Sequence, residues 1–113
     1  MITVYGIKNC DTVRKALKWL DAEGIEHTFH DFRADGLDEA TVQRWVDALG
    51  WESVLNKRST TWKNLTDADK QDLDGAGAVA LMVAHPTLVK RPVFDGENIL
   101  LQGFTDTVRQ QLS

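Results

Sequence analysis

Cys10 is the single cysteine of this 113-residue chain and its clearest candidate for covalent chemistry. It follows a short turn at residues 6–9 and immediately precedes a helical pattern that opens at Asp11. A cysteine at the start of a helix faces unpaired backbone N–H groups and the positive end of the helix dipole, and both favour thiolate over thiol. Because only the thiolate attacks, this position predicts a nucleophile.

The alternative is a buried and inert cysteine, since a lone cysteine commonly packs as a small apolar side chain. The neighbouring charges favour the reactive interpretation. Lys8 lies two residues before Cys10, and Arg14 and Lys15 lie within the first turns of the helical pattern that follows. Cations near the sulfur stabilise its anionic form.

Composition and charge exclude several classes of function. The net charge of −4 counts against general nucleic-acid binding, which needs a basic surface. A single cysteine forms no disulfide within the chain, and Met1 leads directly into an apolar strand pattern without a basic leader. No apolar run approaches the length of a membrane span. We therefore expect a cytoplasmic monomer that contacts neither nucleic acid nor membrane.

The histidines do not indicate a metal site. His27 and His30 are three residues apart on a predicted strand, so their side chains point to opposite faces, and His85 is distant in sequence. The cations are more informative, because seven of the thirteen fall in three short clusters. A fold that joins these clusters would form a cationic pocket for a small anion or a carboxylate ligand. The seven are Lys8, Arg14, Lys15, Lys57, Arg58, Lys90 and Arg91.

The hydrophobic periodicity predicts the elements that position Cys10. Residues 2–5 and 27–32 are typical of strands, and residues 11–23 between them have helical spacing. Asp11 is the expected N-cap of this helix and Gly24 the residue after its C-cap. Strand, helix and strand over about thirty residues predict a βαβ unit with two parallel strands.

The middle of the chain is expected to be helical and its end to return to the sheet. Asp38 is the predicted N-cap of a helix that ends before Gly50, and residues 74–77 are expected to form a connector. The other helices are predicted at 62–65, 67–73 and 76–84, the strands of a hairpin at 92–95 and 98–101, and a last short helix after Gly103. This order predicts a single α/β domain over residues 1–113, with a thioredoxin-like (glutaredoxin-like) mixed sheet and a helical insertion at about 36–84.

Three motifs in order resemble the arsenate reductase (ArsC) superfamily of the glutaredoxin-coupled type. They are Tyr-Gly-Ile-Lys-Asn-Cys-Asp-Thr-Val-Arg-Lys-Ala at residues 5–16, Leu-Asn-Lys-Arg at 55–58 and Val-Lys-Arg-Pro-Val at 89–93. The nearest branch is that of the YffB-like proteins, for which glutathione-dependent thiol reduction is suspected. The Spx regulators form a sister branch and share the Arg-Lys-Ala-x-x-Trp-Leu run at residues 14–20.

The resemblance implies roles for individual residues. Cys10 matches the nucleophile, and Arg58 and Arg91 match arginines that bind the anion or the developing charge. Pro92 matches the cis-proline that lies opposite the cysteine in thioredoxin-like folds. Thr12 either hydrogen-bonds to the region of the sulfur or serves the helix cap. The residues expected to bind substrate are Lys8, Asn9, Thr12, Arg14 and Pro92.

The sequence also departs from these relatives. The reductases have a histidine four residues before the cysteine, where this chain has Gly6, and a third arginine that residues 93–108 lack. These differences count against efficient arsenate reduction. The Cys-x-x-Cys switch of the Spx branch is also missing, because Val13 stands at the second position. An oxidised Cys10 must therefore be resolved by an external thiol, for which glutathione is the abundant candidate.

We interpret the chain as a glutathione-dependent thiol/disulfide oxidoreductase with one nucleophilic cysteine. Its expected substrate is a glutathione mixed disulfide or another small anion, including arsenate, and it needs no bound cofactor. Glutathione is the expected co-substrate, with glutaredoxin as a further partner. The alternatives are a non-enzymatic, Spx-like regulator that binds RNA polymerase, and a chain that has lost activity and keeps only the fold.

Overall fold

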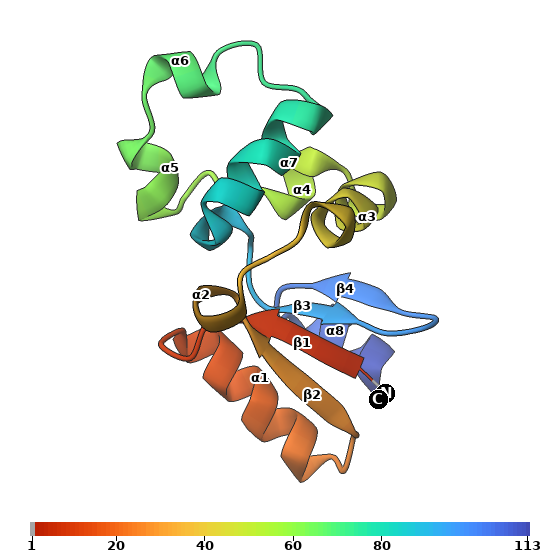
Figure 1. The fold of residues 1–113 in the computed structure, drawn as a ribbon. Coiled ribbons are helices and arrows are strands. Elements are labelled where there is room, and N and C mark those ends of the chain that lie inside the picture. The colour runs from red at the N-terminus through yellow and green to blue at the C-terminus, as the bar shows by residue number, and fades with distance from the viewer. Residues whose placement is uncertain (1) are drawn as a thin grey trace. The chain divides into compact units, whose positions relative to one another are not determined.

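The chain divides into two compact units in a computed structural model that describes residues 2–113 (Figure 1). Unit 1 contains the residues up to Asp35 together with Arg91–Ser113, and unit 2 is the intervening segment Gly36–Lys90. Met1, with which we expected the chain to enter its first strand, lies outside the described residues. Within residues 2–113, every helix is too short or too polar to span a lipid bilayer.

Unit 1 is built on a four-stranded mixed sheet in the order β2-β1-β3-β4. Its strands are β1 (Ile2–Gly6), β2 (His27–Asp31), β3 (Val93–Asp95) and β4 (Leu100–Gln102). The pair β1–β2 is parallel, as the βαβ pattern predicts, whereas β1–β3 and β3–β4 are antiparallel. The predicted α/β class with a mixed sheet is therefore confirmed.

One face of this sheet is covered by α1 (Asp11–Ala22) and α8 (Asp106–Leu112). Val4 of β1 and Phe94 of β3 are paired in register, and both are fully buried. The apolar positions of the two helices repeat at helical spacing and pack on this strand pair. The resulting cluster consists of Val4, Ala16, Leu20, Phe94, Val108 and Leu112. The shared core fixes where α1 begins relative to the end of β1.

Unit 2 is helical, and two of its helices pack around the fully buried Trp45 and Met82. Its helices are α3 (Glu39–Leu49), α4 (Trp51–Val54), α5 (Thr60–Asn64), α6 (Asp67–Lys70), α7 (Gly75–Ala84) and the 3-10 helix η1 (Pro86–Leu88). The segment after α4 is held against the end of the unit, because the Asn56 N–H donates to the carbonyl of Leu88 at 2.7 Å. Unit 2 therefore has its own core and its own backbone pairing.

The helix boundaries correct one expectation near Cys10. We predicted Asp11 as the N-cap of α1, but the N-cap is Cys10, which has extended backbone angles (φ −98°, ψ 121°). Its carbonyl accepts from the Arg14 N–H at 3.0 Å, so the helix includes Asp11 as its first residue. Gly24, at φ +69°, follows the C-cap as predicted.

Other boundaries differ in unit 2 and at its entrance. Residues 74–77 were predicted to be a connector, but only Asp74 lies outside α7, and its carboxylate caps the helix by accepting from the Gly77 N–H at 2.8 Å. The helix predicted at 67–73 ends at Lys70, where α6 stops. Two short helices, α2 (Phe32–Asp35) and α4, had no predicted counterpart, since one turn is too short to show a period. The predicted cap at Asp38 is confirmed, with the Thr41 N–H donating to its carboxylate at 2.7 Å.

Gly6, the last residue of β1, is where the strand comes closest to α1. A Cβ built at this position would lie 2.7 Å from Cγ2 of Val13, which is fully buried. Valine is stiff about χ1, so its methyl group cannot turn away without cost. The small residue therefore allows α1 to start directly beneath the end of the strand.

We expect Gly6→Ala to lower the free energy of unfolding by about 1–3 kcal/mol, because the added methyl group overpacks the contact with Val13. Denaturant unfolding followed by circular dichroism measures the change. Gly75→Ala is the matched control, since its Cβ would meet its nearest neighbour at an ordinary 3.8 Å. That control should be neutral or stabilising by about 0.4–1 kcal/mol. Equal effects of the two substitutions would contradict the close contact at Gly6.

Candidate active site

Cys10 ends the turn that connects β1 to α1. Its N–H donates to the carbonyl of Ile7 at 3.3 Å, which closes the turn, and the residue is half-buried. Cys10 is the N-cap residue of α1, the position at which serine or aspartate commonly caps a helix, and no side chain caps α1. From this position a negatively charged group accepts hydrogen bonds from the first-turn N–H groups.

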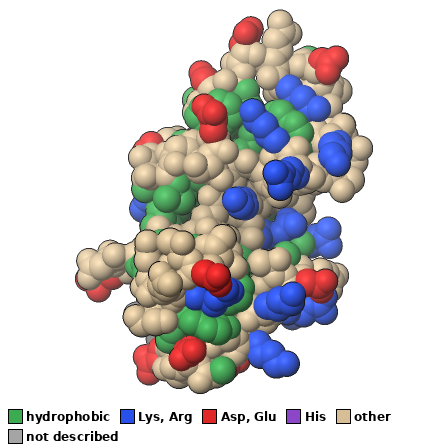
Figure 2. Space-filling model, turned by 180° about the vertical axis from the view of Figure 1, so that it is seen from behind, with side chains coloured by type: hydrophobic (Ala, Val, Ile, Leu, Met, Phe, Trp, Pro, Cys, Tyr) green, Lys and Arg blue, Asp and Glu red, His purple; other side chains and the backbone are tan. Residues whose placement is uncertain are grey.

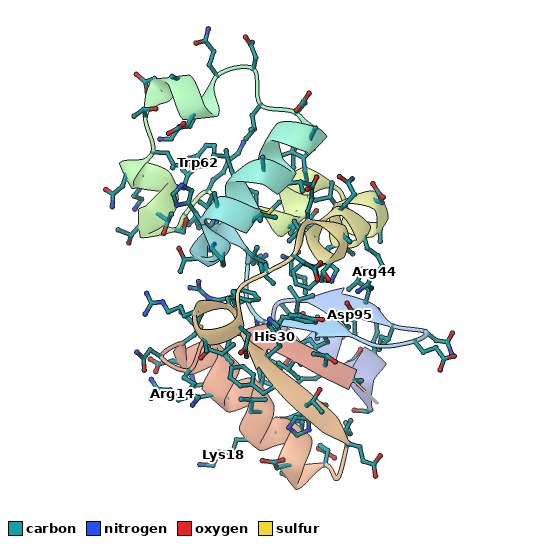
Figure 3. The ribbon with its side chains drawn as sticks, in the orientation of Figure 1. Arg14, Lys18, His30, Arg44, Trp62 and Asp95 are labelled. Atoms are coloured by element: carbon teal, nitrogen blue, oxygen red, sulfur yellow. The ribbon has the colours of Figure 1, made fainter. Side chains whose placement is uncertain are left out.

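The cations near Cys10 in unit 1 are exposed. Arg14 is paired with Asp11 at 2.7 Å, and both side chains are open to solvent, so the pair is readily exchanged for a ligand. Lys8 and Lys15 are also exposed, and neither ammonium group pairs with a carboxylate within residues 2–113. Figure 3 shows Arg14 and Lys18 extending outward from α1. These side chains give the start of α1 a positive surface.

The register of the sheet brings Pro92 to the end of β1. Tyr5 pairs with Val93 in the antiparallel ladder, so the next positions outward are Gly6 on one strand and Pro92 on the other. Pro92 is buried, its carbonyl accepts from the Gly103 N–H at 2.9 Å, and the Arg91–Pro92 bond is cis, as the resemblance implied. The turn that carries Cys10 and the entry to β3 therefore lie at the same end of the sheet.

Arg91 directly precedes this proline and is half-buried. Because it opens the C-terminal segment of unit 1, it belongs to the same unit as Cys10. A guanidinium at this end of the sheet can grip a carboxylate or oxyanion through two parallel hydrogen bonds. Unit 1 alone thus contains a thiol, an arginine and the exposed cations of α1.

Arg58 lies in unit 2, after α4. Its backbone N–H donates to the side-chain oxygen of Asn56 at 3.0 Å, which holds the segment in a turn and leaves the guanidinium exposed. Lys57 beside it is also exposed. The role assigned to Arg58 by resemblance stays a prediction.

The remaining predicted residues flank the thiol without forming a defined contact. Asn9 is exposed in the turn, and Thr12 is exposed in the first turn of α1. The Thr12 hydroxyl makes no hydrogen bond with any other of residues 2–113, so neither of its two suggested roles, a bond toward the sulfur or a helix cap, is seen there. Within residues 2–113, no group of three or more histidine, cysteine, aspartate or glutamate side chains could hold a metal ion.

Sequence reasoning missed a set of contacts between lysines and tryptophans in unit 2. Lys57 lies over the rings of Trp51 and Trp62, and Lys70 also lies over Trp62. These residues come from α4, α5, α6 and the turn between α4 and α5, so no single helical period links them. The only available signal was the interleaving of tryptophan and lysine between residues 51 and 70.

Comparison with known proteins supports the resemblance. A model of the ArsC family matches residues 5–111. The solved structure of a protein named YFFB is 42% identical and superposes with a TM-score of 0.95, covering 100% of both chains. An arsenate reductase (ArsC) related protein from Brucella melitensis is also 42% identical, with a TM-score of 0.77 over 97% of this chain and 92% of that one. The predicted thioredoxin-like fold is thereby confirmed.

The global transcriptional regulator Spx from Streptococcus pyogenes is a more distant relative. It is 28% identical over 100% of this chain and 86% of its own length. The Spx branch that the sequence resembled is thus present among the relatives.

Proposed function

Because this chain belongs to the ArsC family, we propose that it is a thiol oxidoreductase in which Cys10 is the nucleophile. The observation that carries the proposal is the place of Cys10, half-buried at the uncapped N-terminus of α1 and at the same end of the sheet as Pro92. The N-terminus of a helix is in general a favourable place for an anionic group. The activity belongs to a reducing compartment such as the cytoplasm, where a lone thiol stays reduced.

The proposed reaction is thiol–disulfide exchange in two steps. The Cys10 thiolate attacks the glutathione sulfur of a mixed disulfide, which forms a Cys10–glutathione disulfide and releases the substrate thiolate. A second glutathione thiolate, or a glutaredoxin thiolate, then attacks the glutathione sulfur of that adduct. This step forms glutathione disulfide, or a glutaredoxin–glutathione disulfide, and releases the Cys10 thiolate. Over the two steps the substrate leaves as a thiol, and the sulfur–sulfur bond passes to the glutathione product. No bound cofactor takes part.

The cations supply recognition in this scheme. Arg91 and the exposed Lys8 and Arg14 lie in the same unit as the thiol and hold the carboxylates of glutathione. The assignment of Arg58 to the same anion rests on the family resemblance alone. We assign Asn9 and Thr12, which flank Cys10 in the sequence, to the approach to the sulfur. Arginine is favoured because its planar guanidinium makes two parallel hydrogen bonds to one carboxylate.

We expect the mixed disulfide to be turned over faster than arsenate. The histidine of the related reductases would stand at Gly6, where even a Cβ approaches Val13 to 2.7 Å. Residues 93–108 contain no lysine or arginine, and Asp95 and Glu97 add negative charge there. The loss of one donor to an oxyanion costs on the order of 10²–10³-fold in rate.

The experiment compares the two substrates with the same protein. Both reactions contain glutathione, glutathione reductase and NADPH. The first adds a small glutathione mixed disulfide, and the second adds arsenate and glutaredoxin. Consumption of NADPH is followed in both. Turnover above the protein-free rate in the first reaction alone is the expected result. Turnover only with arsenate would replace the proposed substrate, and turnover in neither would contradict the enzymatic proposal.

A second candidate function is a non-enzymatic regulator that binds RNA polymerase. Two observations favour it, namely the run at residues 14–20 and the Spx relative at 28% identity. Direct binding to purified RNA polymerase, retained in Cys10→Ser and accompanied by no disulfide turnover, would support this function over the enzymatic one.

A further inference from the structure

One segment of unit 2 concentrates positive charge in a chain whose net charge is −4. Residues 53–66 contain three cations, Lys57, Arg58 and Lys63, and no aspartate or glutamate. All three side chains are exposed. In the upper part of Figure 2, which belongs to unit 2, lysine and arginine side chains lie beside hydrophobic ones. The segment therefore forms a positive surface within an acidic protein.

Two half-buried tryptophans hold lysines on this surface. The Nζ atom of Lys57 lies 5.6 Å from the ring centroid of Trp51 and 5.8 Å from that of Trp62, and Nζ of Lys70 lies 5.1 Å from Trp62. Trp62 projects from α5 toward α6 (Figure 3). Contacts of this length between an ammonium group and an indole are attractive. These contacts restrict the rotamers of Lys57 and Lys70. Binding of a ligand therefore costs less side-chain conformational entropy.

The charges of this surface are not neutralised by the described part of the chain. Within residues 2–113, none of Lys57, Lys63 and Lys70 forms an ion pair. Arg14 and Arg109 of unit 1, in contrast, are each paired with an aspartate three residues earlier. The carboxylates nearest in sequence are those of Glu52, Asp67, Asp69 and Asp72, and within residues 2–113 none of them pairs with these lysines. Asp69 accepts instead from the Thr66 N–H. The lysines are thus available to a partner.

We propose that Trp51, Lys57, Trp62, Lys63 and Lys70 form a docking surface for an acidic segment of a partner protein, and we name it the Lys–Trp surface. Carboxylates of such a segment would pair with the three ammonium groups, while its aliphatic parts would contact the exposed edges of the indoles. The proposal does not depend on the function proposed for Cys10.

Charge and geometry favour a short acidic peptide over a nucleic acid. Single-stranded nucleic acid needs a long basic track and aromatic faces on which bases stack. Here both indoles already carry an ammonium group near the ring, and the positive segment is bounded by Glu52 and Asp67. A few carboxylates match a few lysines, whereas a polyphosphate chain would extend into the acidic surroundings.

The test measures binding of a short fluorescent peptide of glutamate, aspartate and glycine by anisotropy at low salt. The double variant Lys57→Glu/Lys70→Glu should weaken binding about tenfold or more, since like charges then face the peptide. Lys15→Glu/Lys18→Glu on α1 is the matched control, because it changes the net charge equally at two exposed sites and should bind like the wild type. Lys63→Glu, which removes no contact with a tryptophan, should also weaken binding and excludes misfolding as the cause.

Three outcomes would overturn the proposal. Equal weakening by the two double variants would show an effect of net charge alone. Unchanged binding in Lys57→Glu/Lys70→Glu and Lys63→Glu would remove the Lys–Trp surface from recognition. Tighter binding of a fluorescent oligothymidylate than of the peptide, lost in the same variants, would assign the surface to nucleic acid instead.

Discussion

Replacing Cys10 by serine should abolish turnover of the glutathione mixed disulfide. The substitution exchanges sulfur for oxygen at the N-cap of α1, and a serine hydroxyl forms no disulfide with glutathione. Because serine is also a good N-cap, the helix should remain intact or become more stable. Enzymes accelerate reactions by about 10⁶-fold or more, so loss of the nucleophile should reduce the rate by several orders of magnitude. The coupled NADPH assay measures this loss.

A second measurement identifies the covalent step itself. Wild-type protein treated with the mixed disulfide, in the absence of free glutathione, should gain the mass of one glutathionyl group, and Cys10→Ser should gain none. Cys10 is the only cysteine in the chain, so the adduct has one possible position. Turnover that persists in Cys10→Ser, with unchanged circular dichroism, would remove the thiol from the mechanism.

Arg91→Ala should have the second largest effect, a fall in kcat/KM of about 10²-fold, comparable with loss of one oxyanion donor. Arg91 lies next to Pro92 and in the same unit as Cys10, whereas Arg58 lies in unit 2. Of these two arginines, Arg91 is therefore the one whose guanidinium we expect to contact the bound anion. Arg91→Lys should recover only part of the loss, because an ammonium group keeps the charge but not the two parallel hydrogen bonds. Steady-state kinetics at varied mixed-disulfide concentration measures both variants.

Arg33→Ala provides the matched control for Arg91→Ala. Arg33 is an exposed arginine of α2 in the same unit, and its backbone N–H donates to the carboxylate of Asp31. Its removal lowers the positive charge equally and should leave kcat/KM close to the wild-type value. If the two alanine variants lose activity to the same degree, the effect belongs to total charge and not to Arg91.

The local order of elements was predictable because it rests on periodicities within short stretches. The helical spacing of Val13, Ala16 and Leu20 predicted α1, and all three are fully buried. The strands at its two ends then required a parallel pair, which the register Val4–Phe29 confirms. These inferences needed no knowledge of distant contacts.

Errors arose where a side chain has two possible roles. Asp11 is a common N-cap type, but its carboxylate pairs with Arg14 from inside the helix while Cys10 takes the cap position. Residues 74–77 appeared to be a connector because glycine is a poor helix former. The cap at Asp74 and the apolar residues that follow still start α7 at Gly75. Tertiary packing outweighs propensity at such positions.

The candidate site was predictable in part. The position of Cys10 after a strand and before a helix is a local property of the sequence. The place of Pro92 beside the end of β1 depends on a ladder between opposite ends of the chain, and only the family resemblance implied it. The contacts of Trp62 with Lys57 and Lys70 join separate short helices and turns, so no helical period could have indicated them.

The central position of β1 in the sheet has a consequence for how the protein is made. Its partner β3 contains residues near the C-terminus, and all of unit 2 is translated between them. One edge of β1 therefore stays without its partner on the ribosome until the residues of β3, which follow unit 2, have emerged. Such unpaired edges promote aggregation of nascent chains, and pairing over large sequence separations slows folding. The thiol of Cys10 acquires its final surroundings only after unit 2 has been synthesised and β3 has paired with β1.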